Sequence, residues 1–243
     1  MTFRVRVRRT IAAVLVTAAI GALGTASASS LGGLAPFGLL STNAALTSGT
    51  PTVLGCDDFS RAAATGSALV NRPVQLPAKC GNATWTAHTG TWTITAGQLG
   101  AITAGATASI VAGQISASAQ ATVLNANGTG RTAGVAIDHT GATRTFLAAV
   151  VTGGNTLSLQ LSTAGVISSL STIAVTLGVT NVVRITRNGT AVTVSLDGNV
   201  RISFTLTAGQ VTTLAAGTRA GLYWNAGSTV RFSNFLVTTA STP

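Results

Sequence analysis

Few side chains in this sequence could do acid–base chemistry. The chain contains no Glu, and its acidic residues are Asp57, Asp58, Asp138 and Asp197. Asp57 and Asp58 are adjacent, so on a strand their side chains point to opposite faces, while Asp138 and Asp197 fall at predicted turns. A glycosidase generally needs two carboxyl groups about 5 to 9.5 Å apart across the bond that it cleaves. The sequence therefore argues against an acid-pair glycosidase.

The two histidines, His88 and His139, are the candidate general bases for a Ser-His-Asp site. His139 directly follows Asp138, and neighbouring side chains cannot readily form the hydrogen bond by which the acid orients the base. The sequence also lacks a G-x-S-x-G nucleophile motif. We interpret residues 138–141 as an exposed polar turn, and explain His88, just before Thr89-Gly90, in the same way. We predict that the protein is not an enzyme.

Oxygen-bearing side chains near the two ends of the predicted domain could hold a metal ion. Calcium prefers several oxygen ligands, and Asp57 or Asp58 with backbone carbonyls and Asn234 could form a structural calcium site. The alternative is that these side chains hydrogen-bond to the closing strand. We predict no other cofactor.

Aromatic residues near the C-terminus are the candidate ligand-binding groups. Sugars bind to exposed aromatic faces that have a few fixed hydrogen-bonding groups beside them. Tyr223 and Trp224 are adjacent, so one of them faces outward if both lie in a strand. We predict a platform of Tyr223 or Trp224, with Asn225 and Arg144 or Arg184 nearby. The alternative is that these aromatic residues are ordinary packed side chains.

The elements that must position these residues are short β-strands. From Val53 onward the chain is a succession of short β patterns, and no segment keeps a helical period for three turns. Asn127-Gly128, Asn188-Gly189 and Asp197-Gly198 are dipeptides typical of hairpin turns with positive φ. We predict an all-β, antiparallel β-sandwich (jelly roll) of two sheets.

The predicted strands share an alternating or continuous apolar pattern. They cover residues 91–95, 109–112, 115–124, 132–138, 145–151, 156–161, 166–170, 182–187, 191–196, 200–206, 220–224 and 230–237. Trp92 alternates with Ile94 and is predicted to lie in the core, as is Trp85. Residues 182–206 are predicted to form a three-stranded meander whose charged side chains, such as Arg187, keep the strand faces soluble.

The first residues are predicted to direct export. Four of the chain's arginines lie within the first nine residues, an apolar stretch runs from Ile11 to about Leu23, and Ala26-Ser27-Ala28 resembles a cleavage site. We predict a signal peptide over residues 1–28, a linker or poorly ordered leader over 29–52, and a domain over 53–240. The general secretory route is favoured over the twin-arginine route. The protein is expected outside the cell or at its surface, with no stable membrane span after cleavage.

The charge of the chain is basic, but it does not predict nucleic-acid binding. The formal net charge is +10, from 14 basic and four acidic residues. Without the first four arginines ten basic residues remain, a net charge of +6, and these ten are scattered singly. Nucleic-acid binding usually needs a clustered basic stripe.

The two cysteines, Cys56 and Cys80, are predicted to form a disulfide, because an even count in an exported chain favours one. Such a bond would stabilise the fold by roughly 3.5 kcal/mol in the chain-entropy model. A metal pair and two free thiols are the alternatives. Neither histidine lies at zinc-finger spacing from the cysteines.

Several motifs resemble those of laminin-G-like and other concanavalin A-like lectin/glucanase domains. VRITRNGTAVTVSLDG resembles their strand–turn–strand unit, and AGLYWNAGSTVRFSNFLV resembles their closing strand pair. CDDFSR and WTAHTGTWTITAGQL resemble the opening motifs of secreted bacterial members. The resemblance covers nearly all of residues 56–238 and implies a jelly roll of two curved antiparallel sheets. Hydrolase members of this fold use a strand with paired Glu residues around an Asp, and this chain has no Glu.

The resemblance does not imply one function, because this fold hosts sugar-binding, catalytic, adhesive and structural domains. Our leading hypothesis is a secreted non-catalytic β-sandwich that binds extracellular or cell-wall carbohydrate. The alternative is a structural or adhesive cell-surface protein without a small-ligand site, which would pack against other copies of itself or against an envelope layer.

Overall fold

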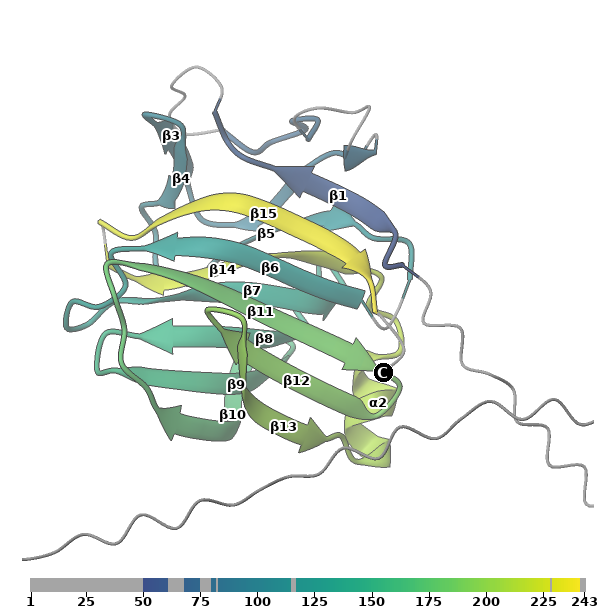
Figure 1. The fold of residues 1–243 in the computed structure, drawn as a ribbon. Helices are drawn as coiled ribbons and strands as arrows, with labels where there is room; N and C mark the ends of the chain where they lie inside the picture. The colour runs from purple at the N-terminus through teal and green to yellow at the C-terminus, as the bar shows by residue number, and fades with distance from the viewer. Residues whose placement is uncertain are drawn as a thin grey trace, which may run out of the picture. The chain divides into compact units, whose positions relative to one another are not determined.

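Two antiparallel β-sheets pack face to face in this protein (Figure 1). The structure is a computed structural model that describes residues 50–60, 68–74, 80–81, 83–114, 117–227 and 229–240, and within them fifteen strands form the two sheets. The predicted all-β sandwich is therefore confirmed. The predicted signal peptide, residues 1–28, and most of the predicted leader lie outside the described residues.

The eight-stranded sheet includes the meander that the sequence predicts, because β11, β12 and β13 pair in chain order. Its strands are, in spatial order, β13 (Asn199–Thr205), β12 (Ala191–Leu196), β11 (Thr180–Asn188), β6 (Ala117–Leu124), β15 (Arg231–Thr239), β4 (Gln98–Ala101) and β3 (Trp92–Thr95), with β1 (Val53–Asp57) also paired to β15.

The seven-stranded sheet lies behind the first in Figure 1. Its strands are, in spatial order, β10 (Val166–Ala174), β9 (Thr156–Thr163), β8 (Phe146–Thr152), β7 (Thr132–His139), β14 (Arg219–Ala226), β5 (Ala106–Val111) and β2 (Thr86–Thr89). The chain passes repeatedly between the two sheets, which is the connectivity of a jelly roll.

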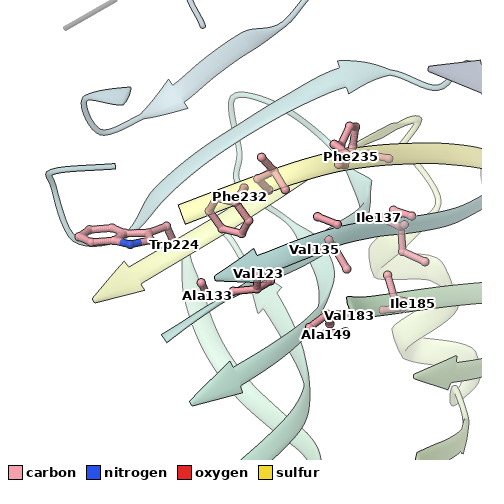
Figure 2. Packing of buried hydrophobic residues seen from close by; sticks show 14 of the residues in the cluster. Val123, Ala133, Val135, Ile137, Ala149, Val183, Ile185, Trp224, Phe232 and Phe235 are labelled. Atoms are coloured by element: carbon pink, nitrogen blue, oxygen red, sulfur yellow. The ribbon is translucent and has the colours of Figure 1, made fainter. Parts of the chain in front are cut away.

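The core lies between the sheets and is built from alternate residues of facing strands. Figure 2 shows Val183 and Ile185 of β11 near Val135 and Ile137 of β7, and all four side chains are buried. Successive strand residues point to opposite faces, so an apolar residue at every second position covers the inner face of each sheet. Trp85 and Trp92 are buried as predicted.

Hairpin turns set the register of the meander. Asp197 and Gly198 both have positive φ, and Asp197 Oδ1 accepts a hydrogen bond from the Val182 backbone N–H at 2.7 Å. Asp197 is therefore a turn residue, as predicted. The prediction of positive φ at Asn127-Gly128 is wrong, because in that loop Asn125 and Gly130 adopt the left-handed conformation.

A short helix, α2 (Ala208–Leu214), follows β13, although the sequence predicts no helix. Thr207 and Gln210 form a capping box, in which each side chain accepts a hydrogen bond from the other residue's backbone N–H. Leu214 is the buried residue of the helix. Seven residues give only about two turns, too few for a helical period to stand out. No helix in the described part of the chain is long and apolar enough to cross a membrane.

The predicted disulfide is present and anchors the first strand of the sandwich. Cys56 of β1 is bonded to Cys80, with the two Cα atoms 4.8 Å apart. The bond closes a loop with a sequence separation of 24 residues.

Candidate functional site

The face of the seven-stranded sheet that points away from the core carries a pocket of about 130 Å³. Its lining residues come from β5, β8, β9, β10 and β14 and from the loops beside them; they are Gly105, Thr107, Arg144, Phe146, Ser162, Gly165, Ile167, Tyr223 and Asn225. On β14 the core residues are Ala220, Leu222 and Trp224, so Tyr223 and Asn225 point outward. We call this surface the outer face.

The structure brings together three of the five residues that the sequence proposes as a ligand platform. Tyr223, Asn225 and Arg144 line the pocket on the outer face. Trp224 points the other way and belongs to the core, where it is 3% exposed. Arg184 lies on the other sheet, in β11, and its Nε donates a hydrogen bond to Ser118 Oγ. Of the predicted alternatives, the pocket therefore contains Tyr223 rather than Trp224 and Arg144 rather than Arg184.

Tyr223 is largely buried, although it faces away from the core. It is 6% exposed and packs in a small cluster with Ala136, Phe146, Ala148 and Val150, separate from the main core. The Tyr223 and Phe146 ring centroids are 5.6 Å apart, with the rings tilted by 47°. Burial raises the pKa of Tyr223, so its hydroxyl stays protonated at neutral pH.

Small residues pack beside Tyr223 on the outward side of the sheet. Gly134 of β7 lies directly opposite Tyr223 in the strand pairing. A Cβ atom at Gly134 would collide with the Ala149 carbonyl oxygen, so only glycine fits there. Ala136 and Ala148 are buried in the same cluster as Tyr223.

Arg144 is held at the pocket by the backbone of its own loop. It has a φ of +51°, and its N–H donates to the Gly141 carbonyl at 3.0 Å. Its carbonyl accepts hydrogen bonds from Ser162 Oγ at 2.6 Å and from the Gly165 N–H at 3.3 Å. The guanidinium lies against Gly165, where a Cβ atom would be 2.8 Å from Arg144 Cζ. The absence of a side chain at Gly165 thus makes room for the cation.

A row of four rings continues from the pocket across the outer face. His139 stacks between His88 and Phe146, with ring centroids 4.6 and 5.0 Å apart, and Phe146 contacts Tyr223. His139 ends β7 and is 1% exposed, so the interpretation of residues 138–141 as an exposed polar turn is wrong. A β-bulge at Asp138, whose φ is +52°, allows Asp138 to point inward and His139 outward.

His88 is also part of this row rather than of an exposed turn, because it lies in β2 and contacts a buried serine. Its Nε2 is 2.7 Å from Ser109 Oγ, which also accepts a hydrogen bond from Arg219 Nε at 2.8 Å. The Ser109 hydroxyl can therefore donate its hydrogen to a neutral His88. Ser109 is 0% exposed, and neither it nor His88 hydrogen-bonds to a carboxylate in the described part of the chain. The pair supports the sheet and does not present a nucleophile.

Burial keeps both histidines neutral. Burial first, and then the positive charge of Arg219, lowers the pKa of His88 to about 4. Burial, followed by His88 and Arg219, lowers the pKa of His139 to about 3. His139 Nδ1 accepts a hydrogen bond from the Gly141 N–H at 2.7 Å, so in the neutral ring the hydrogen is on Nε2.

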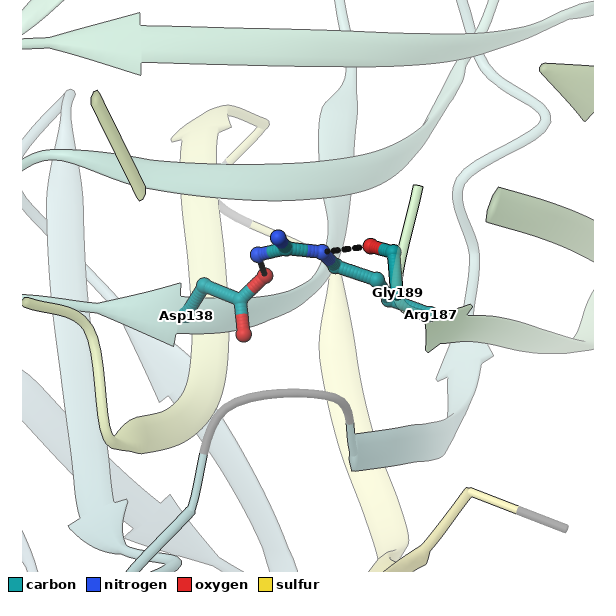
Figure 3. Close-up of polar contacts among 3 residues, drawn as sticks. All are labelled: Asp138, Arg187 and Gly189. Carbon is teal, nitrogen blue, oxygen red and sulfur yellow. Dashed lines mark hydrogen bonds and ion pairs between the residues drawn. The ribbon is translucent and has the colours of Figure 1, made fainter. Parts of the chain in front are cut away.

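Asp138 forms a buried ion pair between the two sheets (Figure 3). Arg187 Nη1 lies 2.6 Å from Asp138 Oδ2, and Arg187 Nε donates to the Gly189 carbonyl at 2.7 Å. Arg187 is 2% exposed, so the expectation that it solubilises a strand face is wrong. The pair joins β7 of one sheet to β11 of the other.

The residues predicted to bind calcium line one pocket of about 260 Å³. Asp57, Asp58 and Asn234 all contribute to it. Both oxygens of Asp57 are already hydrogen-bonded, Oδ1 to the Phe59 N–H and Oδ2 to Trp85 Nε1, each at 2.9 Å. The described residues contain no cluster of three or more His, Cys, Asp or Glu side chains that could hold a metal ion. The Asp57 side chain thus hydrogen-bonds to Phe59 and Trp85 rather than to the closing strand. Calcium binding stays a prediction.

Sequence reasoning missed Phe146, Thr107 and Ser162 as members of the pocket. Phe146 and Leu147 are neighbours in β8, so their side chains point to opposite faces of the sheet. Leu147 belongs to the core, and Phe146 therefore points outward. That pattern alone identifies an outward aromatic residue. Its contact with Tyr223 depends on the pairing of β8, β7 and β14, which the local pattern does not contain.

Comparison with known proteins identifies the fold. No protein-family model and no curated protein sequence matches the chain. The carbohydrate-binding module CBM66 from Bacillus subtilis superposes with a TM-score of 0.53 at 14% identity, over 64% of this chain and 95% of that one. A protein of unknown function with a galectin-like fold, also from Bacillus subtilis, gives 0.51 at 10% identity, over 79% and 98% of the two chains.

An enzyme is also among the similar structures. The GH43 protein BlXynB from Bacillus licheniformis gives a TM-score of 0.53 at 13% identity, over 76% of this chain and 39% of that one. At these identities the similarity establishes architecture alone. Together with the two-sheet topology, it shows that this chain has a jelly-roll β-sandwich fold, shared with a carbohydrate-binding module and a galectin-like protein.

Proposed function

We propose that this protein is a non-catalytic carbohydrate-binding β-sandwich that acts outside the cell, and that the outer face is its binding surface. The observation that carries the proposal is the pocket that joins Tyr223, Asn225 and Arg144 on one sheet face. An aromatic ring with an amide, a guanidinium and hydroxyl groups around it is the set of contacts that suits a sugar.

The size of the pocket favours one unit of a longer glycan. At about 130 Å³ it is smaller than the roughly 300 to 1,000 Å³ of pockets that enclose drug-sized ligands. The row of His88, His139 and Phe146 extends from Tyr223 across the same face. Because His139 and Phe146 are 1% and 2% exposed, the pocket itself, rather than the row of rings, is the place for the sugar.

The positions of the carboxylates support a binding role over hydrolysis. All four acidic residues of the chain are described, and none lines the pocket. Asp138 is paired with Arg187 inside the sandwich, and Asp57 is hydrogen-bonded to Phe59 and Trp85. A hydrolase of this kind would need two carboxyl groups across the scissile bond.

Two further observations support the proposal. The disulfide between Cys56 and Cys80 is typical of proteins in oxidising compartments such as the cell exterior. One structure with the same fold is described as a carbohydrate-binding module.

A glycan array with the purified protein tests the proposal, followed by affinity measurements on any glycan retained. Tyr223→Phe and Asn225→Ala should each weaken binding about five-fold, the effect of losing one hydrogen bond of about 1 kcal/mol. Both changes are small enough to leave the sheet intact. Arg184→Gln, on the opposite sheet, is the matched control and should bind like the wild type. Failure to retain any glycan, or equal affinity in all variants, would refute the proposal.

A further inference from the structure

We infer that the glycan bound at this pocket is acidic, and that Arg144 recognises the carboxylate of a uronic acid unit. The inference rests on the proposed function and adds the chemical class of the ligand. Its basis is an unbalanced charge: Arg144 lines the pocket, and no carboxylate does.

The charge at the pocket is not neutralised by the protein. The side chain of Arg144 has no hydrogen bond or ion pair in the described part of the chain, and Arg144 is exposed. The only salt bridge among the described residues joins Asp138 and Arg187 inside the sandwich. Asp197 lies on a hairpin of the opposite sheet, where it caps the Val182 N–H. An anionic ligand would therefore supply the missing countercharge.

A second arginine adds to the positive potential of the outer face. Arg219 of β14 donates to Ser109 and Thr86, both of them neutral. Its charge contributes to the lowered pKa of His88 and of His139. Two arginines without a carboxylate on one sheet face attract anions and disfavour cations.

Arg144 is suited to a carboxylate by its shape and by its fixed position. A guanidinium presents parallel N–H donors that match the two oxygens of a carboxylate. The backbone of Arg144 is fixed by contacts with Gly141, Ser162 and Gly165, and its side chain lies against Gly165. Because the loop backbone is already ordered, the conformational entropy lost on binding there is that of the exposed side chain alone.

The other polar groups of the pocket suit the remainder of the sugar. The Tyr223 hydroxyl and the Asn225 side chain make no hydrogen bond within the described residues. A hydroxyl and an amide can each donate and accept, which is what ring hydroxyls of a sugar require. A uronic acid unit therefore meets a complementary group for its charge and others for its hydroxyls.

Binding to paired glycans that differ only in charge tests the inference. Polygalacturonate, alginate and hyaluronan are each compared with the same polymer after methyl esterification, which masks the carboxylates and keeps the backbone. We expect at least one acidic polymer to bind ten-fold or more tightly than its ester. Arg144→Gln should abolish this difference, a loss of about 10- to 100-fold for a charge-assisted hydrogen bond. Arg144→Lys keeps the positive charge but loses the paired N–H donors of the guanidinium, so it should keep only part of the preference for acid over ester.

The control separates recognition from general attraction to a basic protein. Arg184→Gln removes the same charge from the opposite sheet and should leave the acid-to-ester ratio unchanged. If it lowers the ratio as much as Arg144→Gln does, the inference is wrong. A second result would also overturn the inference: the protein binds neutral glycans, shows no preference for acid over ester, and loses affinity in Tyr223→Phe but not in Arg144→Gln. That result would leave the proposed function intact. If the protein retains no glycan at all, both the proposed function and the inference are wrong.

Discussion

Lowering the pH from 7.5 to 5.0 should destabilise this protein through its buried histidines, with His139 as the main source. His139 is 1% exposed and stacked between two rings, and its pKa is about 3 in the fold against an ordinary value of 6.5. The unfolded chain therefore binds a proton below about pH 6.5, whereas the folded chain keeps His139 neutral until the pH approaches 3. Lowering the pH through this window favours the unfolded state.

The size of the effect follows from the two pKa values. At pH 5.0, protonation of an ordinary histidine stabilises the unfolded chain by about 2 kcal/mol relative to pH 7.5, and the folded chain gains almost nothing in return. His88, with a pKa of about 4, acts in the same direction, but its partial exposure reduces its share. We expect the free energy of unfolding to fall by about 2 to 3 kcal/mol.

This chain is well suited to the measurement because it has only two histidines and both cysteines are in a disulfide. Few other groups titrate between pH 5.0 and 7.5. Urea unfolding followed by tryptophan fluorescence at several pH values gives the free energy of unfolding. His139→Phe keeps a ring for stacking on Phe146 but cannot titrate, so it should lose about 2 kcal/mol of the pH dependence. An unchanged pH dependence in His139→Phe, or an imidazole NMR signal of His139 that titrates near pH 6.5, would refute the reasoning.

Two other predictions concern stability. Asp138→Asn should lower the free energy of unfolding by about 3 to 5 kcal/mol, because it leaves the buried charge of Arg187 uncompensated. Urea denaturation measures this, and a loss no greater than that of Arg201→Gln, at an exposed site, would contradict it. Cys80→Ser should cost roughly 3.5 kcal/mol, given the loop that the disulfide closes. In thermal melts, a reducing agent should destabilise the wild type alone; equal melting curves for wild type and variant in oxidising buffer would count against it.

Local pattern was sufficient for much of the fold. Apolar patterns identify twelve of the fifteen strands, but not β1, β2 or β4. Asp197-Gly198 identifies a hairpin, because turn conformation depends on neighbouring residues. The pairing of Cys56 with Cys80 follows from their being the two cysteines of the chain. Helix α2 was not predicted, because it has only seven residues and one buried leucine. A segment this short does not show a helical repeat of apolar residues.

The candidate site depended more on tertiary structure. From the sequence we predicted Tyr223, Asn225 and Arg144 as binding residues, and the structure places these three at the pocket. Arg184 was predicted on the same grounds, because it is equally basic and lies in a similar strand pattern. Only the assignment of β11 to the opposite sheet separates Arg184 from the others. Local sequence states which side chains share a strand face, but not which sheet that strand joins.

The buried charges and rings illustrate the same limit. The sequence by itself determined that this is an acid-poor, disulfide-bonded chain of short antiparallel strands, since composition and alternation depend only on chain order. Tertiary structure alone decided that Asp138 meets Arg187 inside the sandwich and that His139 lies between His88 and Phe146. A β-bulge at Asp138 shifts the alternation of β7, so that Asp138 points inward like Ile137 and His139 points outward. Their partners come from distant strands. Such contacts depend on sheet pairing and packing, which link residues far apart in the chain.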